Sequence, residues 1–214
     1  MSDRSASSLS SSQRIRPPLQ QRSQAAWNRI LDAGTHILIE QGRDALTIQA
    51  TCRRARVSPT ALYARVDGLS GLFWAIYDRW IGQVVTTYER LLQAAAQTED
   101  PIDRVRAVVR AMCENIERHE RFLHQIINLA VTDEALRERG SRESLVYVER
   151  VAALLPQRPA GAATDVARMV HRECVFRALY GDHWLSRRPE SWAAFTRRVT
   201  IMALGRFGWL QFGD

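Results

Sequence analysis

The sequence predicts an all-α protein, with a three-helix N-terminal helix-turn-helix domain, a larger C-terminal helical domain and about nine helices in total. Apolar residues recur at three- and four-residue spacing through most of the chain. No segment shows convincing strand alternation. The stretch RVSPTALYARVDGLSGLF, at residues 56–73, also joins a very short helix to a long one. Such a short helix is stable only when it packs against neighbours.

The N-terminal pattern begins with a Ser- and Arg-rich segment over residues 1–23, which we expect to be a disordered basic arm. A first amphipathic helix should run from Gln24 to a glycine C-cap at Gly42. Thr47 is placed to cap a second helix, and Ser58, followed by Pro59, is placed to cap a third. The helix-turn-helix would occupy about residues 47–66, within a domain spanning residues 24–84.

The C-terminal pattern, over residues 85–214, is helical throughout and follows a long helix that starts near Leu69. A loop is expected from Pro156 to Gly161, where proline and glycine interrupt the apolar spacing. The helices expected from the apolar spacing cover residues 69–96, 101–116, 122–129, 136–155, 164–186 and 191–212.

The bulk composition favours a cytoplasmic protein that does not enter a membrane. The chain has 214 residues, of which 46% are hydrophobic and 25% charged, as in globular proteins of one or two domains. No apolar run reaches the roughly 18–20 residues that a bilayer crossing needs, and the N-terminus lacks a secretory signal. The chain has 3 widely spaced cysteines, which fit buried thiols in a reducing compartment better than a set of disulfides.

Positive charge gathers at the N-terminal end. Residues 1–67 hold ten Arg against five acidic residues, a formal charge of +5, whereas residues 68–214 carry +2. A basic region of this kind favours a polyanionic partner, although a solvated surface with a loose basic tail is the alternative interpretation.

The short third helix has two different faces. Leu62 and Val66 fall on one side, where they can anchor the helix. The other side carries mostly small residues and could press against the DNA major groove, which admits one helix. Tyr63 could donate to a phosphate, and Thr47 with the start of the second helix also suits a phosphate. The small face consists of Thr60, Ala61, Ala64 and Arg65.

Residues 29–80 resemble the N-terminal DNA-binding domain of the TetR family of transcriptional regulators. The matching features are Ile30-Leu31-x-Ala33, Gln41-Gly42, Leu46-Thr47, Val57-Ser58, and Leu62-Tyr63 followed by Val66 and Leu72. The resemblance implies phosphate contacts at Thr47 and Tyr63, and base-reading positions at Gln49, Pro59, Thr60, Ala61, Ala64 and Arg65. Ser58, the expected cap, completes the candidate DNA-binding set.

The resemblance also implies a C-terminal domain that dimerises and often binds a small molecule. Large aromatic, methionine and histidine residues spread through the middle helices and could line an apolar pocket for an apolar or aromatic effector. An ordinary hydrophobic core is the alternative interpretation for each of them. The candidate ligand-binding residues are Trp80, Tyr88, Met112, Phe122, His124, Tyr147, Met169, Phe176 and Trp184.

The chain gives no positive signal for catalysis, a cofactor or a metal. It lacks a Gly-rich phosphate loop and a GxSxG motif. His119 and His124 are five residues apart, so they point in different directions on a helix. His171 and Cys174 share a helix face, which fits a buried thiol beside a hydrogen-bonded histidine better than a ligand pair.

These features predict a ligand-responsive transcriptional regulator, in this family more often a repressor, that binds a palindromic DNA operator as a homodimer. The last two helices carry more apolar surface than a monomer needs, so we expect them to form the dimer interface. The alternative is an α-helical enzyme or adaptor with a degenerate DNA-binding domain. It is kept open by Leu69, where the family usually has a phosphate-binding Lys.

Overall fold

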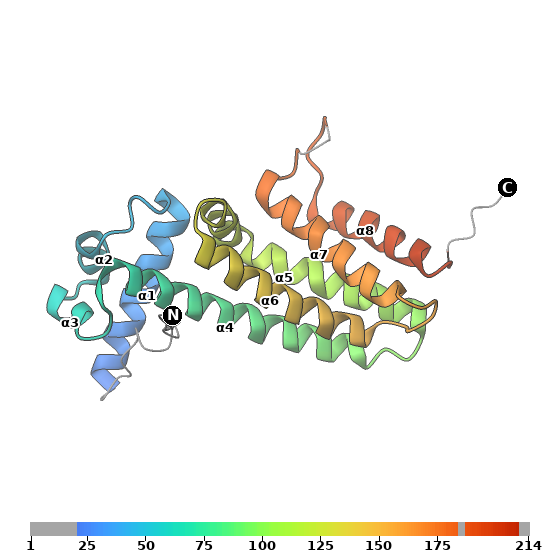
Figure 1. The fold of residues 1–214 in the computed structure, drawn as a ribbon, viewed down its shortest axis with the longest axis horizontal. Helices are drawn as coiled ribbons and strands as arrows, with labels where there is room; N and C mark the ends of the chain where they lie inside the picture. The colour runs from blue at the N-terminus through green and yellow to red at the C-terminus, as the bar shows by residue number, and fades with distance from the viewer. Residues whose placement is uncertain (1–20, 184–186, 210–214) are drawn as a thin grey trace, which may run out of the picture. The chain divides into compact units, whose positions relative to one another are not determined.

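A computed structural model describes residues 21–183 and 187–209 of the chain (Figure 1). All the regular elements in these residues are helices. Eight are present: α1 (Gln21–Gln41), α2 (Ile48–Ala55), α3 (Pro59–Tyr63), α4 (Gly68–Ala96), α5 (Pro101–Ala130), α6 (Glu134–Leu154), α7 (Ala162–Tyr180) and α8 (Trp192–Arg206).

The helix count differs from the expected nine because α5 is continuous. The charged segment 117–121 interrupts the apolar spacing but contains only Glu, Arg and His, which do not break a helix. Two other helices end earlier than expected: α7 stops at Gly181, which has a φ of 79°, and α8 stops at Arg206. The chain is helical from Gln21, and the rest of the predicted N-terminal arm lies outside the described residues.

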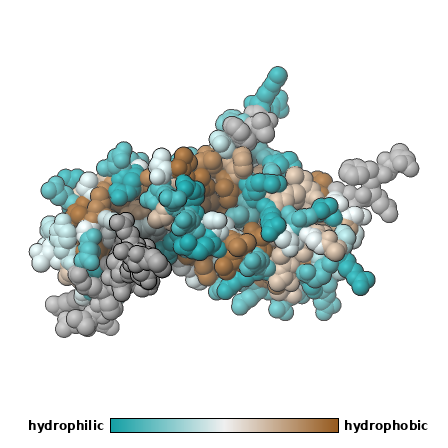
Figure 2. All heavy atoms as spheres, in the orientation of Figure 1, coloured by the Kyte–Doolittle hydropathy of each residue, from teal (hydrophilic) through white to brown (hydrophobic). Residues whose placement is uncertain are grey.

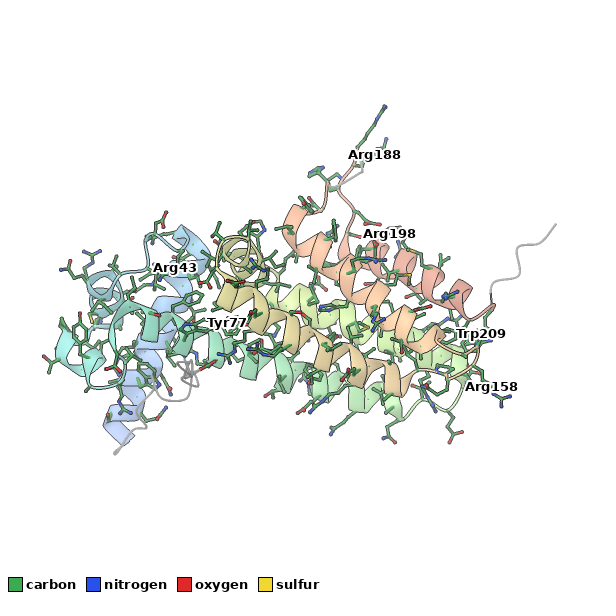
Figure 3. The ribbon with its side chains drawn as sticks, in the orientation of Figure 1. Arg43, Tyr77, Arg158, Arg188, Arg198 and Trp209 are labelled. Atoms are coloured by element: carbon green, nitrogen blue, oxygen red, sulfur yellow. The ribbon has the colours of Figure 1, made fainter. Side chains whose placement is uncertain are left out.

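The chain divides into two compact units, and the boundary falls within the sequence of α4: the first unit ends at Gly82 and the second starts at Gln83. In the first unit, α1 packs against both α2 and α3. Arg79 of α4 braces α1 through an ion pair with Asp32 at 2.9 Å and a hydrogen bond to the Asn28 carbonyl at 3.3 Å. The core of this unit includes Ile30, Leu38, Leu46, Leu62, Leu72, Ile76 and Tyr77, the last of which Figure 3 labels.

In the second unit, α5 is the central helix, because it contacts α6, α7 and α8. Its buried face follows the three- and four-residue spacing that the sequence predicted. The first half of that face includes Val105, Val108, Val109, Met112, Cys113 and Ile116.

The face of the molecule seen in Figure 2 is a mosaic of hydrophilic and hydrophobic residues. None of the helices in the described part of the chain combines the length and apolar character needed to cross a membrane.

Candidate nucleic-acid interface

Both helices of the helix-turn-helix begin at the capping residues that the sequence predicted. The Thr47 hydroxyl accepts a hydrogen bond from the Ala50 N–H at 3.0 Å, at the start of α2. The Ser58 hydroxyl accepts from the Ala61 N–H at 3.3 Å, at the start of α3. Pro59 occupies the first helical position, where no N–H is required. These caps fix where the two short helices start.

The turn between the two helices depends on Arg56, which adopts the left-handed conformation with φ 55° and ψ 50°. Its N–H bonds back to the carbonyls of Arg53 and Cys52, so it ends α2 and redirects the chain. This conformation costs an L-residue about 1–2 kcal/mol, and glycine is the usual residue here. The turn is therefore held by the packing on both sides of it.

The helix α2 is held against α1 from one side. Arg29 of α1 donates to the Ala55 carbonyl at 3.2 Å, and Glu40 pairs with Arg54 at 2.9 Å. Thr51 is fully buried, and its hydroxyl donates to the Thr47 carbonyl at 2.8 Å. This internal bond satisfies a polar group in the core, so Thr51 fills a position where an apolar residue would otherwise be expected.

The helix α3 has one buried side and one exposed side. Leu62 and Val66 are buried, as predicted. Tyr63 is 51% exposed, and Ala61 is half-buried. The remaining exposed members of the candidate set are Thr47, Gln49, Ser58, Pro59, Thr60 and Ala64. The structure therefore presents eight of the nine candidate positions at or near the surface of one unit.

The ninth candidate, Arg65, is not on this surface. It is only 5% exposed, and its guanidinium donates a hydrogen bond to the Ser23 hydroxyl of α1. The prediction that Arg65 shares the exposed face with Thr60 and Ala64 is wrong. The α-helix ends at Tyr63, so the helical spacing used to place Arg65 no longer applies there.

Exposed arginines at the end of α2 were not among the predicted contacts. Arg53 and Arg56 are exposed, close in sequence to the start of α3. The run Arg53-Arg54-x-Arg56 is visible in the sequence and could have drawn attention to this positive surface. Exposed arginines of this kind are the side chains that commonly bind a phosphate backbone.

No protein-family model matches the chain, and no curated protein matches it in sequence. Solved structures do match. A Mesorhizobium loti protein assigned to the TetR family has 17% identity and a TM-score of 0.70, over 88% of this chain and 98% of that one. A TetR-family transcriptional regulator from Streptomyces coelicolor has 18% identity and a TM-score of 0.65, over 86% and 89% of the two chains.

A third structure, a TetR/AcrR-family transcriptional regulator from Thermobifida fusca, has 14% identity and a TM-score of 0.64. It covers 90% of this chain and 100% of its own. The chain has the TetR-family fold. At these identities the likeness concerns the fold, and it extends through both units of the chain.

In this TetR-family fold, the predicted ligand-binding residues fall into several environments. Tyr88, Met112, Phe122 and Tyr147 are buried in the second unit, and the rings of Tyr88 and Tyr147 meet edge to face at 5.0 Å. Met169 and His124 are half-buried, and His124 donates from Nδ1 to the Ala178 carbonyl at 3.1 Å.

Three of the predicted ligand residues do not join this group. Phe176 is 45% exposed, so its predicted place in an enclosed pocket is wrong; it lies beside Tyr180, with ring centroids 5.7 Å apart. Trp80 belongs to the first unit, with its ring 5.9 Å from Tyr77. Trp184 lies outside the described residues.

A groove of about 930 Å³ lies between α5 and α8, and none of the predicted ligand residues lines it. Four arginines and two glutamates border it, with Trp192 as its main apolar side chain. The lining residues are Arg106, Arg110, Glu114, Glu117, Arg118, Trp192, Ala193, Thr196, Arg197 and Thr200. The buried group around Tyr147 therefore remains a predicted ligand site, separate from this groove.

Two polar groups in that buried region have no hydrogen-bond partner within the described residues. They are the Tyr147 hydroxyl and Nδ1 of His171, and the two rings are 5.5 Å apart. Burial lowers the pKa of His171 to about 4, so this imidazole is neutral at pH 7. The sequence predicted a hydrogen-bonded histidine beside Cys174, but Nδ1 of His171 neither accepts nor donates a hydrogen bond within the described residues.

Proposed function

We propose that the chain is a transcriptional regulator that binds a two-fold symmetric DNA operator as a homodimer and is released by a small apolar or aromatic effector. It would act in the cytoplasm, as a repressor. The observation that carries the proposal is the exposed face of α3, supported from behind by Leu62 and Val66, in a chain with the TetR-family fold.

The shape of α3 suits the major groove of DNA. Its exposed side combines Pro59, Thr60 and Ala64, which let the backbone approach base edges closely. Tyr63 at the rim would donate its hydroxyl to a phosphate. Thr47 and the first N–H groups of α2 would bind a second phosphate at a positive helix end.

Dimerisation is supported by apolar residues exposed on the last two helices. Phe176 and Tyr180 of α7, and Ile201 and Met202 of α8, are exposed in the single chain. Exposed apolar residues gathered on adjacent helices are typical of protein interfaces. A two-fold pairing of α7 and α8 would bury them in a four-helix contact and place two α3 helices to read paired half-sites.

Effector response would follow from linkage between ligand binding and the spacing of the two α3 helices. Suppose that an effector binds better to a conformation in which the spacing of the two α3 helices does not match the operator half-sites. Its binding then lowers DNA affinity by the same coupling free energy. A coupling of about 1–3 kcal/mol changes affinity by roughly 5–150-fold. The buried group around Tyr88 and Tyr147 is the proposed effector site.

A gel shift with the promoter fragment beside the chain's own gene tests the DNA-binding part. The wild-type protein should retard this fragment in the presence of excess unrelated DNA. Tyr63→Phe, which removes one hydroxyl, should weaken binding moderately, and Tyr63→Ala should weaken it strongly. Leu145→Ala is the matched control, because Leu145 is also half-exposed but lies on α6. Binding that is sequence-blind and lost at moderate salt would instead favour an enzyme or adaptor with a degenerate DNA-binding domain.

A further inference from the structure

Cys113 of α5 and Cys174 of α7 lie side by side in the core of the second unit. Their sulfurs are 3.8 Å apart, and the residues are 1% and 0% exposed. Both are free thiols. A disulfide needs the sulfurs about 2.05 Å apart, so the two must approach by about 1.8 Å, which side-chain rotation and small helix shifts can supply.

The surroundings of the pair make one sulfur the better nucleophile. Hydrogen bonds from the Cys174 thiol and then from the Thr196 hydroxyl lower the pKa of Cys113, against the effect of burial. Arg198 acts in the same direction and Glu117 against it. The pKa of Cys174 is raised well above its usual value by its bond to Cys113 and by burial. The lowered pKa of Cys113 and the raised pKa of Cys174 favour Cys113 as the attacking cysteine and Cys174 as the resolving cysteine.

Tyr147 is a further titratable group near the pair. Burial raises the pKa of Tyr147 well above its usual value, and charges on Cys174 and Cys113 raise it further. Its buried hydroxyl has no hydrogen-bond partner within the described residues. The raised pKa keeps this phenol neutral, so it adds no second negative charge near a thiolate at Cys113.

A route to the pair is provided by the groove between α5 and α8. Thr196, whose hydroxyl bonds to Cys113, also lines this groove, so the groove reaches a side chain that contacts the sulfur. Four arginines against two glutamates give the lining of the groove a net positive formal charge. Figure 3 shows Arg198 on α8, and it bonds to Glu173 of α7 at 3.3 Å, next to Cys174. Reactive cysteines occur in electropositive sites of this kind.

We propose that Cys113 and Cys174 form an oxidation site for hydroperoxides, which link the two residues in a disulfide between α5 and α7. The Cys113 thiolate attacks the peroxide oxygen, the O–O bond breaks, and a sulfenic acid forms with release of hydroxide or alkoxide. The Cys174 thiol then attacks the sulfenic sulfur and releases water. With hydrogen peroxide the balance is two thiols and one peroxide to one disulfide and two waters. This site does not depend on the proposed DNA binding.

Peptide mapping tests the proposal on the full-length reduced protein. The protein is treated with stoichiometric hydrogen peroxide, alkylated without reduction and digested with trypsin. The expected product joins peptide 111–118 to peptide 173–177, because each contains one of the two cysteines. It should weigh two hydrogens less than the two peptides together and disappear after reduction.

Cys52 provides an internal control in the same experiment. It is a buried free thiol of the first unit, in peptide 44–53, and burial raises its pKa. It should remain alkylatable only after unfolding and should not enter a cross-link. Equal oxidation of all three cysteines, or a link that forms only in urea, would overturn the proposal.

Single variants separate the two roles. Cys174→Ser should leave a sulfenic acid at Cys113 that dimedone traps, whereas Cys113→Ser should give no trapped product at residue 174. Cys52→Ser should form the link at the wild-type rate. Dimedone trapping mainly at residue 174 would contradict the assigned order of attack. The wild-type peptide map requires no variant, so the test holds even if a serine variant fails to fold.

Discussion

Ser23 accepts a hydrogen bond from Arg65, and this contact ties the end of the helix-turn-helix to the start of α1. Arg65 was expected to face DNA but is buried instead. An arginine in this position helps to hold α3 at a fixed place on α1, so its main contribution is structural.

The variant Arg65→Ala should therefore lower the free energy of unfolding by about 1–3 kcal/mol, since a buried hydrogen bond to a charged group is lost. Urea unfolding measures this change. Arg53→Ala, at an exposed arginine of α2, is the control and should change stability by no more than about 0.5 kcal/mol. If Arg65→Ala keeps wild-type stability but loses DNA affinity, Arg65 contacts DNA and the structural role is wrong.

Capping and DNA binding can be separated at Ser58. Ser58→Ala removes the bond to the Ala61 N–H and should cost about 0.5–2 kcal/mol of stability. Ser58→Asp keeps a capping oxygen and should retain near wild-type stability, but its negative charge would lie next to a DNA phosphate. We expect gel shifts to show weaker binding for the aspartate variant than for the alanine variant. The opposite order would place Ser58 away from DNA.

Because Arg56 is left-handed and Arg53 is helical, replacing each of them by glycine should change the stability of the protein in opposite directions. Arg56→Gly should stabilise the protein by about 0.5–1 kcal/mol, because glycine adopts this conformation without a steric cost. Arg53→Gly removes the same charge from within α2 and should cost about 1 kcal/mol. Thermal unfolding of both variants at one salt concentration checks the signs. If Arg56→Gly destabilises the protein, the Arg56 side chain stabilises the fold by more than its left-handed backbone conformation costs.

The proposed interface can be tested by placing a charge on α7. Phe176→Arg should convert a dimer to a monomer in light-scattering measurements, because a two-fold axis would bring a charge into an apolar contact on both copies. Leu145→Arg on α6, at a similarly exposed residue, should remain a dimer. Loss of the dimer in the Leu145 variant alone would place the interface on α6.

Protonation of His171 should make the fold less stable in acid. Its pKa is about 4 in the folded chain, below the roughly 6.5 of an unfolded one, so the unfolded state binds more protons between these values. The stabilisation that depends on neutral His171 is complete above about pH 6.5. As pH falls to about 4 it is lost progressively, which lowers the free energy of unfolding by about 3 kcal/mol in total. His171→Phe should flatten urea-unfolding stability over this range. Because the pKa of His119 is also lowered, some slope should remain; an unchanged slope would exclude His171.

The helix starts were the most predictable part of the fold. Thr47, Ser58 and Pro59 mark them with local chemistry that depends on a few adjacent residues. The continuity of α5 was less predictable, because a charged segment looks like an interruption in apolar spacing although it propagates a helix well.

The candidate sites were harder to predict where helical geometry ends or distant segments meet. Arg65 follows the last residue of α3, so a helical projection gave it the wrong side. The Cys113–Cys174 pair joins residues 61 positions apart, and no local pattern indicates that they meet. Phe176 has the helical spacing of a core residue, but a single chain leaves it exposed.

Selection of bound fragments from random DNA tests the central proposal most directly, because it needs no prior operator. We expect enrichment of one two-fold symmetric sequence, with half-site centres one helical turn, about 10–10.5 base pairs, or a multiple of it apart. Tyr63→Ala should abolish this enrichment. Recovery of unrelated sequences by a folded wild-type protein, at a salt concentration where non-specific binding is weak, would contradict it.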